Sequence, residues 1–393
     1  MIIKKNKLKS IIINLSVFGS ILSVSTTALR FTDDIGVGEC LMILSILLFL
    51  FSYRQVVVTG ASRILPSSLI YSFILLNFLG ICFTVFFLSD IANDAYFSGV
   101  IRTALAYGFA IINAIIILLL IADKEDMYFI LKRLIQCFNI INICTFIVLF
   151  SALLAAISSS SRFSGFAKNP NELGTAATIM PFVAFYLYKE KKIKLISLII
   201  TLITVVILAK AISSDALFYA FLASAFLFTF FVTKKYHISL RILLFLVFFL
   251  ILYVFLIKNV ETYIVKTNND GNQASVRYTL WKNALLATEH SPLVGFGPGF
   301  FSGIDRPFEG SEAHNTFIDY LTNTGLIGLS IYLLFLGKIV LRLYAIKEYS
   351  LIVAFFALII FSLFHNILRH PVFWLFLFLM HGYIFINQRA KKC

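Results

Sequence analysis

The chain has 393 residues, of which 60% are hydrophobic and only 13% are charged, and its formal net charge is +14. A soluble domain would carry far more charge, and a β-barrel would show alternating apolar runs of about ten residues. Apolar runs of about 18–24 residues instead predict an all-α, polytopic membrane protein. We expect it to form a single membrane domain over residues 1–393.

Hydropathy predicts about twelve transmembrane helices. In chain order they are expected at approximately 8–29, 39–53, 66–88, 104–122, 134–157, 173–188, 195–209, 216–233, 240–257, 316–337, 349–364 and 371–387. The first apolar run follows four lysines, so a cleavable signal peptide is an alternative to a first helix. We favour a retained helix, because cleavage would leave eleven spans and place the Lys-rich connections on the wrong side of the membrane.

Basic residues gather in the connections on one side of the predicted bundle. They form the runs Lys4–Lys9, Lys189–Lys194, Lys234–Arg241 and Arg389–Lys392. This is the positive-inside bias, and it predicts that both termini are cytoplasmic. The bias also explains the net charge without nucleic acid, for which the sequence contains no recognition module.

Two connections on the outer side are much longer than the others, at residues 158–172 and 258–313. Loops of that length in a compact protein are usually functional or disordered. The second, an extracytoplasmic loop before the tenth helix, contains a predicted surface helix over residues 276–289, which Ser291-Pro292 ends. Its expected apolar stripe consists of Val276, Leu280, Trp281, Ala284 and Leu285. Because Trp favours the headgroup level, we expect this helix to lie along the membrane surface.

The middle of every predicted span is nearly free of charged residues, whereas ion-coupled transporters need such groups near the midplane. There is no internal repeat of the kind found in inverted-repeat transporters. Charged residues gather instead at the outer helix ends, so we expect the working site there. They are Arg162, Lys168, Glu172, Lys210, Asp215, Arg277, His314, Asp319 and Arg369. A flippase or transporter of polysaccharide lipids is the alternative of another class.

His314 precedes the tenth predicted span, with Ser311 expected as the N-cap and Glu312 and His314 in the first turn. The positive end of the helix should keep the imidazole neutral, as a general base for a sugar hydroxyl requires. An ordinary polar residue at a helix start is the alternative. Three further residues bracket the last outer turn and are candidates to line the same cavity: His365, Arg369 and His370.

Asn315, Asp319 and Thr322 fall on one face of the same predicted helix. Asp319 is a candidate to orient a partner or to bind sugar hydroxyls, although it is equally expected to pair with an Arg or Lys. Gly325 and Gly328 are expected to permit close packing of helices.

Five cations of the outer side are candidates to neutralise an anionic leaving group. Arg277 and Lys282 lie on the predicted surface helix, Arg162 and Lys168 in the shorter outer loop, and Lys210 near a helix end. A pyrophosphate without a metal needs guanidinium or ammonium donors, and Arg offers a bidentate fork. Anchoring to lipid headgroups is the alternative.

The sequence predicts neither a nucleotide site nor a metal site. Gly295–Gly299 lacks the preceding strand and the Lys-Ser/Thr ending of a phosphate loop, so a tight turn that brings backbone near the site is expected there. The first outer loop holds three acidic residues, Asp33, Asp34 and Glu39, but the chain contains no Asp-x-Asp pair. A metal-dependent transferase is therefore disfavoured, and we expect no cofactor.

Two groups of short motifs resemble a known family. Residues 277–284 read Arg-Tyr-Thr-Leu-Trp-Lys-Asn-Ala, residues 292–297 read Pro-Leu-Val-Gly-Phe-Gly, and His314-Asn315 precede a Gly-Leu-Ile-Gly run at 325–328. Earlier in the chain, residues 162–165 read Arg-Phe-Ser-Gly and residues 169–174 read Asn-Pro-Asn-Glu-Leu-Gly. In order and approximate spacing, and in its twelve spans with a large penultimate outer loop, the chain resembles the bacterial O-antigen polymerase and O-antigen ligase family.

The resemblance implies a glycosyltransferase whose donor is a glycan on undecaprenyl pyrophosphate. It implies that His314 acts as a base and that Arg277 holds the pyrophosphate. The residues expected to bind substrate are Arg162, Lys210, Asn169, Asn171, Asn315, Asp319 and Lys282. The family commonly has Ser-Arg at the start of the eighth span, where this chain has Ser214-Asp215. Lys210 or Arg162 is expected to supply the missing cation.

We therefore expect an enzyme that polymerises lipid-linked repeat units into O-antigen or capsular polysaccharide on the outer face of the bacterial inner membrane. An O-antigen ligase, which transfers finished chains to the lipid A core, is the alternative. Frequent Ile, Phe, Asn and Lys indicate an AT-rich gene, which is common for polysaccharide clusters and favours the polymerase. The expected partners are the lipid-linked oligosaccharide, membrane lipid, a flippase and a chain-length regulator.

Overall fold

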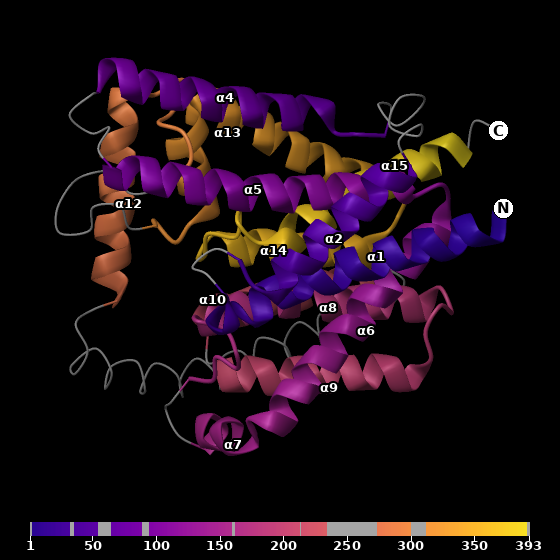
Figure 1. The fold of residues 1–393 in the computed structure, drawn as a ribbon. Coiled ribbons are helices and arrows are strands. Elements are labelled where there is room, and N and C mark those ends of the chain that lie inside the picture. Colours follow the sequence, from indigo (N-terminus) through magenta and orange to yellow (C-terminus); the bar gives the residue numbers. More distant parts are fainter. Residues whose placement is uncertain are drawn as a thin grey trace.

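The computed structural model describes residues 2–31, 35–53, 64–88, 94–158, 162–212, 214–233, 273–299 and 312–390. Within these ranges the chain forms α-helices and one short 3-10 helix, with no strand (Figure 1). The predicted all-α fold is confirmed. The span predicted at 240–257 lies outside the described residues.

The helices follow the predicted spans closely. In chain order they are α1 (Ile2–Ser25), α2 (Val37–Ser52), α4 (Ser67–Phe87), α5 (Asp94–Leu120), α6 (Lys124–Val148), α7 (Phe150–Ser158), α8 (Pro170–Lys189), α9 (Leu195–Ile212), α10 (Asp215–Thr233), α12 (Gln273–His290), α13 (Thr316–Ala345), α14 (Tyr349–Ser362) and α15 (Pro371–Ala390). The helix predicted at 276–289 is found as α12, and its place along a membrane surface stays a prediction.

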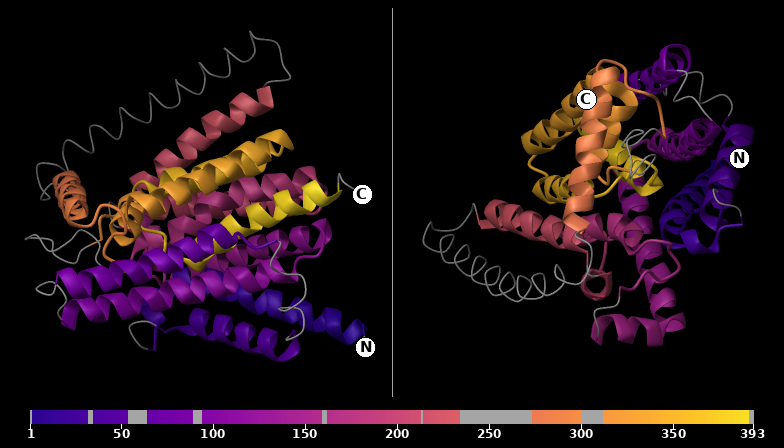
Figure 2. Two further views of the ribbon diagram at one scale, coloured as in Figure 1. Left: turned by 90° about the horizontal axis from the view of Figure 1, so that it is seen from above. Right: turned by 90° about the vertical axis from the view of Figure 1, so that its left-hand side faces the viewer.

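Most of the helices run lengthwise through the molecule, whereas α12 stands across their ends (Figures 1 and 2). Both chain termini lie at the opposite end of the bundle. We call the two ends the α12 end and the terminal end. The perpendicular α12 agrees with the expectation that this helix lies along a membrane surface.

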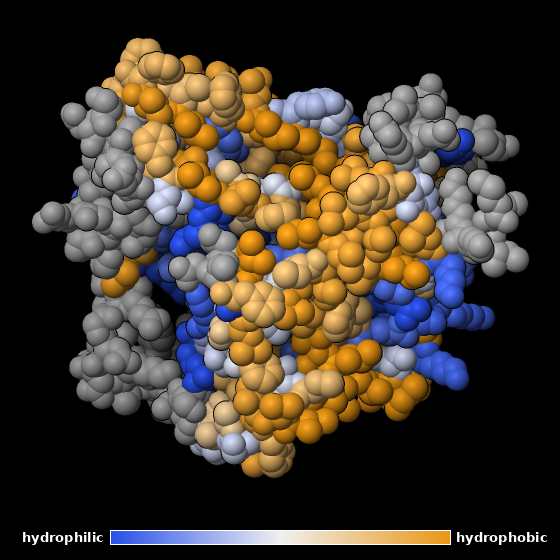
Figure 3. All heavy atoms as spheres, in the orientation of Figure 1, coloured by the Kyte–Doolittle hydropathy of each residue, from blue (hydrophilic) through white to orange (hydrophobic). Residues whose placement is uncertain are grey.

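Seven of the described helices are long and apolar enough to cross a membrane, and three further apolar helices are shorter. Large apolar side chains such as Phe86, Ile147 and Leu334 are more than two thirds exposed. Hydrophobic spheres cover the middle of the molecule in Figure 3, and hydrophilic spheres gather toward its two ends. Such a belt faces lipid rather than water. The chain is a multi-pass membrane protein.

The centre of the bundle is built around α15, which packs against α5 and α13. Its aromatic residues Trp374, Phe376 and Phe378 are almost fully buried. Helix α14 packs between α8 and α10, so the turn from α14 to α15 lies among helices from both halves of the chain. This turn, at residues 363–370, is part of the site described below.

Helix α13 is broken at Gly325, which has φ 65° and ψ −173°. The segment at 291–299 enters the break: Phe296 N–H donates to Thr322 O at 2.8 Å, and Leu326 N–H donates to Pro292 O at 2.8 Å. Backbone can be irregular at membrane depth only where protein satisfies its polar groups, as it does here. The expectation that Gly325 permits helix-to-helix packing is wrong, since the glycine meets the backbone of this loop instead.

One predicted span also differs. The run at 134–157 is divided between α6 and α7, because Leu149 leaves the helical conformation with φ −109° and ψ 36°. Helix α6 begins about ten residues earlier than its apolar run, since the Asp123 side chain caps it by accepting Asp126 N–H at 2.9 Å. A helix that starts with charged turns extends beyond the apolar segment that hydropathy detects.

Candidate active site at the α12 end

His314 lies in the short segment before α13, with φ 53°. The prediction of Ser311 as N-cap is wrong, because α13 begins at Thr316. Asn315 caps it by accepting the N–H groups of Phe317 and Ile318 at 3.0 and 3.2 Å. A left-handed backbone is uncommon for a residue with a Cβ and turns the chain sharply. The imidazole therefore precedes the helix instead of lying in its first turn.

Two hydrogen bonds from different elements hold this segment. Trp281 of α12 donates its indole N–H to Ala313 O at 2.7 Å. Ala313 N–H donates to Oδ1 of Asp319, a carboxylate with no exposed surface. Asp319 thus fixes the residue next to His314. A role in binding sugar hydroxyls stays a prediction for Asp319, as it does for Asn315, whose side-chain oxygen makes the cap.

Burial lowers the pKa of His314 below its ordinary value, and the charge of Arg277 lowers it further. Below-normal pKa means that the imidazole is neutral near pH 7 and free to accept a proton. From the sequence alone, we expected the positive end of the helix to keep His314 neutral. The structure gives a different cause, which is desolvation together with a guanidinium on α12.

His365 is the second imidazole of the site. Its ring centroid is 6.3 Å from that of His314 and 4.9 Å from that of Phe361. Thr316 donates its hydroxyl to His365 O at 2.6 Å, which ties the turn after α14 to the start of α13. Burial lowers the pKa of His365 to about 2, with Arg277 and His314 contributing. The positive charge of Arg277 therefore acts on two neutral imidazoles, those of His314 and His365.

Arg162 approaches the same site from the loop before α8. Its Nε donates to Ile212 O at 3.0 Å, and one terminal nitrogen donates to Asn171 Oδ1 at 2.9 Å. Its charge helps to lower the pKa of His365. The structure therefore joins the predicted residues Arg162 and Asn171. Asn169 is the N-cap of α8 and accepts Asn171 N–H at 3.0 Å.

Two other predicted cations are less closely tied to the site. Lys210 is exposed in the last turn of α9, and Lys282 is exposed on α12. No described contact joins either ammonium to His314. Their substrate-binding roles stay predictions, as does the replacement of the family's arginine near Asp215, whose side chain lies outside the described structure.

The turn from α14 to α15 separates two regions. His365 faces His314, whereas Arg369 and His370 line a different cavity toward α1, α2 and α5. Arg369 forms an ion pair with Glu312, two residues before His314. His370 Nδ1 is 2.7 Å from the hydroxyl of Thr175. The prediction that the three residues line one cavity with His314 is therefore wrong for Arg369 and His370.

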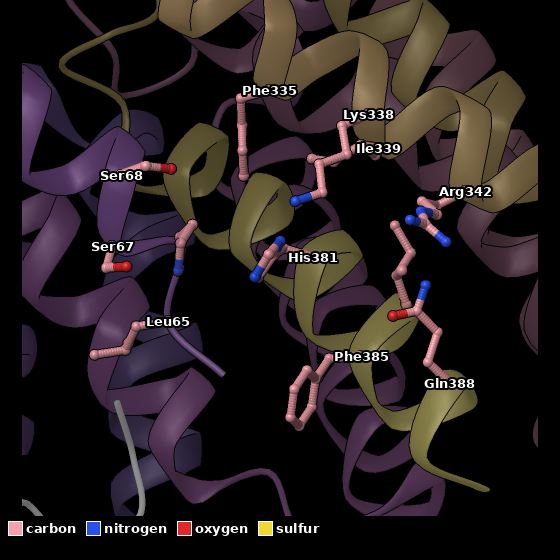
Figure 4. A pocket seen from close by; sticks show the side chains of 12 residues that line it. Leu65, Ser67, Ser68, Phe335, Lys338, Ile339, Arg342, His381, Phe385 and Gln388 are labelled. Atoms are coloured by element: carbon pink, nitrogen blue, oxygen red, sulfur yellow. The ribbon is translucent and has the colours of Figure 1, made fainter. Parts of the chain in front are cut away.

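The terminal end holds another charged pocket of about 320 Å³. Figure 4 shows that Lys338 and His381 point toward one another across it, with Arg342 nearby. The sequence did not single out these residues. Among the described residues, no group of three or more His, Cys, Asp or Glu side chains is arranged to hold a metal ion.

Residues 198–333 match the family model described as O-Antigen ligase. The predicted family resemblance is confirmed. The matched segment contains Lys210, Arg277 and His314, while Arg162 and His365 lie outside it. It supports a membrane enzyme of the O-antigen ligase and polymerase type. Among curated proteins, none matches the chain.

Sequence reasoning missed Arg30 and Arg102, which line the cavity of Arg369, and it gave little weight to His365. A signal for the two arginines was present. Both are single cations at the outer ends of predicted spans, where the positive-inside bias disfavours positive charge. His365 gave no such signal, because its neighbour His314 is far away in the sequence.

Proposed function

We propose that the protein is a glycosyltransferase that polymerises undecaprenyl-pyrophosphate-linked repeat units into O-antigen or capsular polysaccharide. One observation carries the proposal: the family match encloses Arg277 and His314, and burial together with Arg277 lowers the pKa of His314. A neutral base beside a cation suits the attack of a hydroxyl on a carbon that carries an anionic leaving group.

In the proposed reaction, a hydroxyl of the acceptor sugar attacks the anomeric carbon of the donor glycan. His314 accepts the hydroxyl proton as the new C–O bond forms. The bond between the anomeric carbon and the phosphate oxygen breaks, and its electron pair leaves with the lipid pyrophosphate. Alignment of two lipid-held substrates lowers the entropic part of the barrier.

Arg277 and Arg162 would bind the departing pyrophosphate. The charges of both lower the pKa of His365, so both lie close to the turn that holds this imidazole. Guanidinium groups bind phosphate oxygens in bidentate geometry, and contacts of this kind that strengthen as charge develops accelerate the reaction. His365, kept neutral by burial, would contribute a polar partner without adding a third positive charge.

The proposed orientation places the α12 end outside the cytoplasm of a bacterial inner membrane. The Lys-rich connections and both termini would then be cytoplasmic, in agreement with the positive-inside rule. In this orientation the half-buried Trp281 of α12 lies at the headgroup level, where its indole also supports Ala313.

A gene deletion separates polymerase from ligase. For a polymerase, the mutant carries one repeat unit on its surface lipid. A bare lipid A core identifies the ligase, the activity after which the matched family is named. Both outcomes are read from the lipopolysaccharide by gel electrophoresis and mass spectrometry.

A purified system tests the enzyme against a flippase. Full-length protein in lipid nanodiscs, supplied with lipid-linked repeats, should extend them, and His314→Ala and Arg277→Ala should each abolish extension. If both variants extend the repeats at the wild-type rate, the assigned roles of these residues are wrong. A flippase would move the lipid across a vesicle membrane without lengthening the glycan.

A further inference from the structure

Two adjacent cavities lie at the terminal end, where the turn from α8 to α9 meets α6 (Figure 1). The first, which we call the basic cavity, has a volume of about 430 Å³ and lies between residues 132–139 of α6 and residues 191–197. The second, which we call the apolar groove, has a volume of about 580 Å³. It lies between residues 14–18 of α1, 133–143 of α6 and 197–200 of α9.

The two cavities share a polar wall. Gln136, Asn139 and Ser197 line both of them. Arg133, which also lines the apolar groove, donates to Gln136 Oε1 at 2.9 Å and lies 4.9 Å from the ring centroid of Phe129. Neither partner of this guanidinium is negatively charged, so it adds to the positive charge near the wall. One elongated molecule can extend from one cavity into the other.

Four lysines line the basic cavity, and the turn after α8 brings three of them to α6. The four are Lys132, Lys191, Lys192 and Lys194. Lys191 has φ 56°, and Lys192 N–H donates to Leu187 O at 2.8 Å, an arrangement that commonly ends helices. The ammonium of Lys192 pairs with Glu125 at 2.6 Å and lies 4.6 Å from the ring centroid of Tyr128. These contacts hold the turn against the start of α6.

The other carboxylates of the neighbouring turns have partners of their own. Asp126 pairs with Lys9 of α1 at 2.6 Å, and Glu190 pairs with Lys189 at 3.9 Å. Several undescribed ranges continue the chain from helices that end on this side, and they contain no Asp or Glu: 54–63, 234–260 and 391–393. Within the described structure, three lysines of the basic cavity form no ion pair: Lys132, Lys191 and Lys194.

The apolar groove opens to the belt that faces lipid. Its apolar lining residues are Leu15, Phe18, Ile140, Ile143 and Ile200. Ile140 is 57% exposed, and Ile143 is 38% exposed. Because these side chains lie on the apolar surface of a membrane protein, hydrocarbon of the bilayer has access to the groove from the side.

We propose that the two cavities together bind an anionic phospholipid of the cytoplasmic leaflet. Its phosphate would lie among Lys132, Lys191 and Lys194, and one acyl chain would lie in the apolar groove. Basic pockets between membrane helices on the cytoplasmic side suit the headgroups of anionic lipids. A soluble phosphate or an acidic protein segment would use the cations and leave the groove empty. The inference rests on the orientation proposed above, and not on the transfer reaction.

Native mass spectrometry of the full-length protein tests the site, because it counts the lipids that remain bound. The wild type should bind dioleoyl phosphatidylglycerol about tenfold more tightly than dioleoyl phosphatidylcholine, which has the same chains and no net charge. Lys132→Gln/Lys194→Gln should remove most of this preference. Both lysines are exposed, so their replacement does not disturb the core.

A second double variant is the matched control for charge. Arg342→Gln/Lys347→Gln removes two exposed cations at the end of α13, on the same side of the membrane. It should keep the preference for phosphatidylglycerol. An equal loss of preference in the two double variants would overturn the inference, because it would show a general attraction of anionic lipid to a basic surface.

Two tryptophan variants test the place of the acyl chain. Ile143→Trp fills the apolar groove and leaves every cation in place, so it should weaken binding of phosphatidylglycerol about tenfold. Ile147→Trp lies one turn further along α6 at a position that is 71% exposed and outside the groove, and it should bind the lipid as the wild type does. Unchanged binding by Ile143→Trp would overturn the inference. So would displacement of the lipid by an excess of glycerol phosphate, which would identify a site for a soluble phosphate.

Discussion

Histidine and cations precede α13 and α15 at the α12 end and also lie in later turns of both helices, and the two groups differ in how they are held. At the terminal end, His381, Lys338 and Arg342 project from regular helical turns into a pocket. At the α12 end, His314 lies on an irregular segment that Trp281 and Asp319 fix through Ala313. Composition alone does not distinguish the two regions.

The difference lies in the polar framework around each imidazole. The positive-inside bias explains the cations at the terminal end, some of which form ion pairs, such as Lys9 with Asp126 and Lys192 with Glu125. The α12 end instead has a broken α13 whose backbone pairs with residues 291–299, and its imidazole itself lies on a left-handed residue. Such features cost free energy and persist where the surrounding structure over-determines them, which is typical of functional sites.

The largest expected difference concerns the two histidines. His314→Gln should lower the rate of glycan transfer by about 10²–10⁴, the range for loss of a general base. His381→Gln should leave the rate close to wild type, because its pocket lies at the other end of the bundle. Extension of lipid-linked repeats by purified protein measures both. Equal losses of transfer rate in the two variants would contradict a functional difference between the α12 end and the terminal end.

The next comparison uses the cations. Arg277→Gln should lower transfer by about 10²–10³, as for removal of one donor to a developing charge. It should also move the acid limb of the pH–rate profile to higher pH, because the Arg277 charge lowers the pKa of His314 and a protonated base is inactive. Arg342→Gln should change neither. If the acid limb of the pH–rate profile is the same in Arg277→Gln as in the wild type, His314 is excluded as the titrating base.

The smallest expected effect concerns stability. A Cβ on Gly325 would lie 2.2 Å from the backbone carbon of Leu293, at a positive φ, so Gly325→Ala should destabilise the protein by about 1–3 kcal/mol. Gly337 lies in the same helix with nothing within 4 Å of its added Cβ, and Gly337→Ala should be neutral or stabilising by up to about 1 kcal/mol. Thermal melting in detergent compares them. Similar melting temperatures would show that the break tolerates a side chain.

The bounds of most helices could be predicted from the sequence to within a few residues. Helix α9 was predicted at 195–209 and spans Leu195–Ile212, and α15 was predicted at 371–387 and spans Pro371–Ala390. Long apolar runs bounded by lysines or proline leave little choice of structure in a membrane. The surface helix was predictable for a similar reason, because Ser291-Pro292 marks its end.

The site was predictable only in part. His314 and Arg277 were found through motifs, whereas the position of the segment before α13 depends on a hydrogen bond from Trp281 to Ala313 that no local pattern encodes. The break at Gly325 requires backbone partners from residues 291–299, which a single helix cannot supply. The proximity of His365 to His314 likewise arises from tertiary packing rather than from spacing along the chain.

Finally, the hydrogen bond from Trp281 to Ala313 has a mechanical consequence. Helix α12 lies across the bundle, and an indole at a membrane interface follows the level of the headgroups. A bilayer that is too thick or too thin displaces interfacial anchors relative to the spans they flank. We expect any such displacement of α12 to reach the residue before His314 through this hydrogen bond, so that hydrophobic mismatch changes the position of the imidazole.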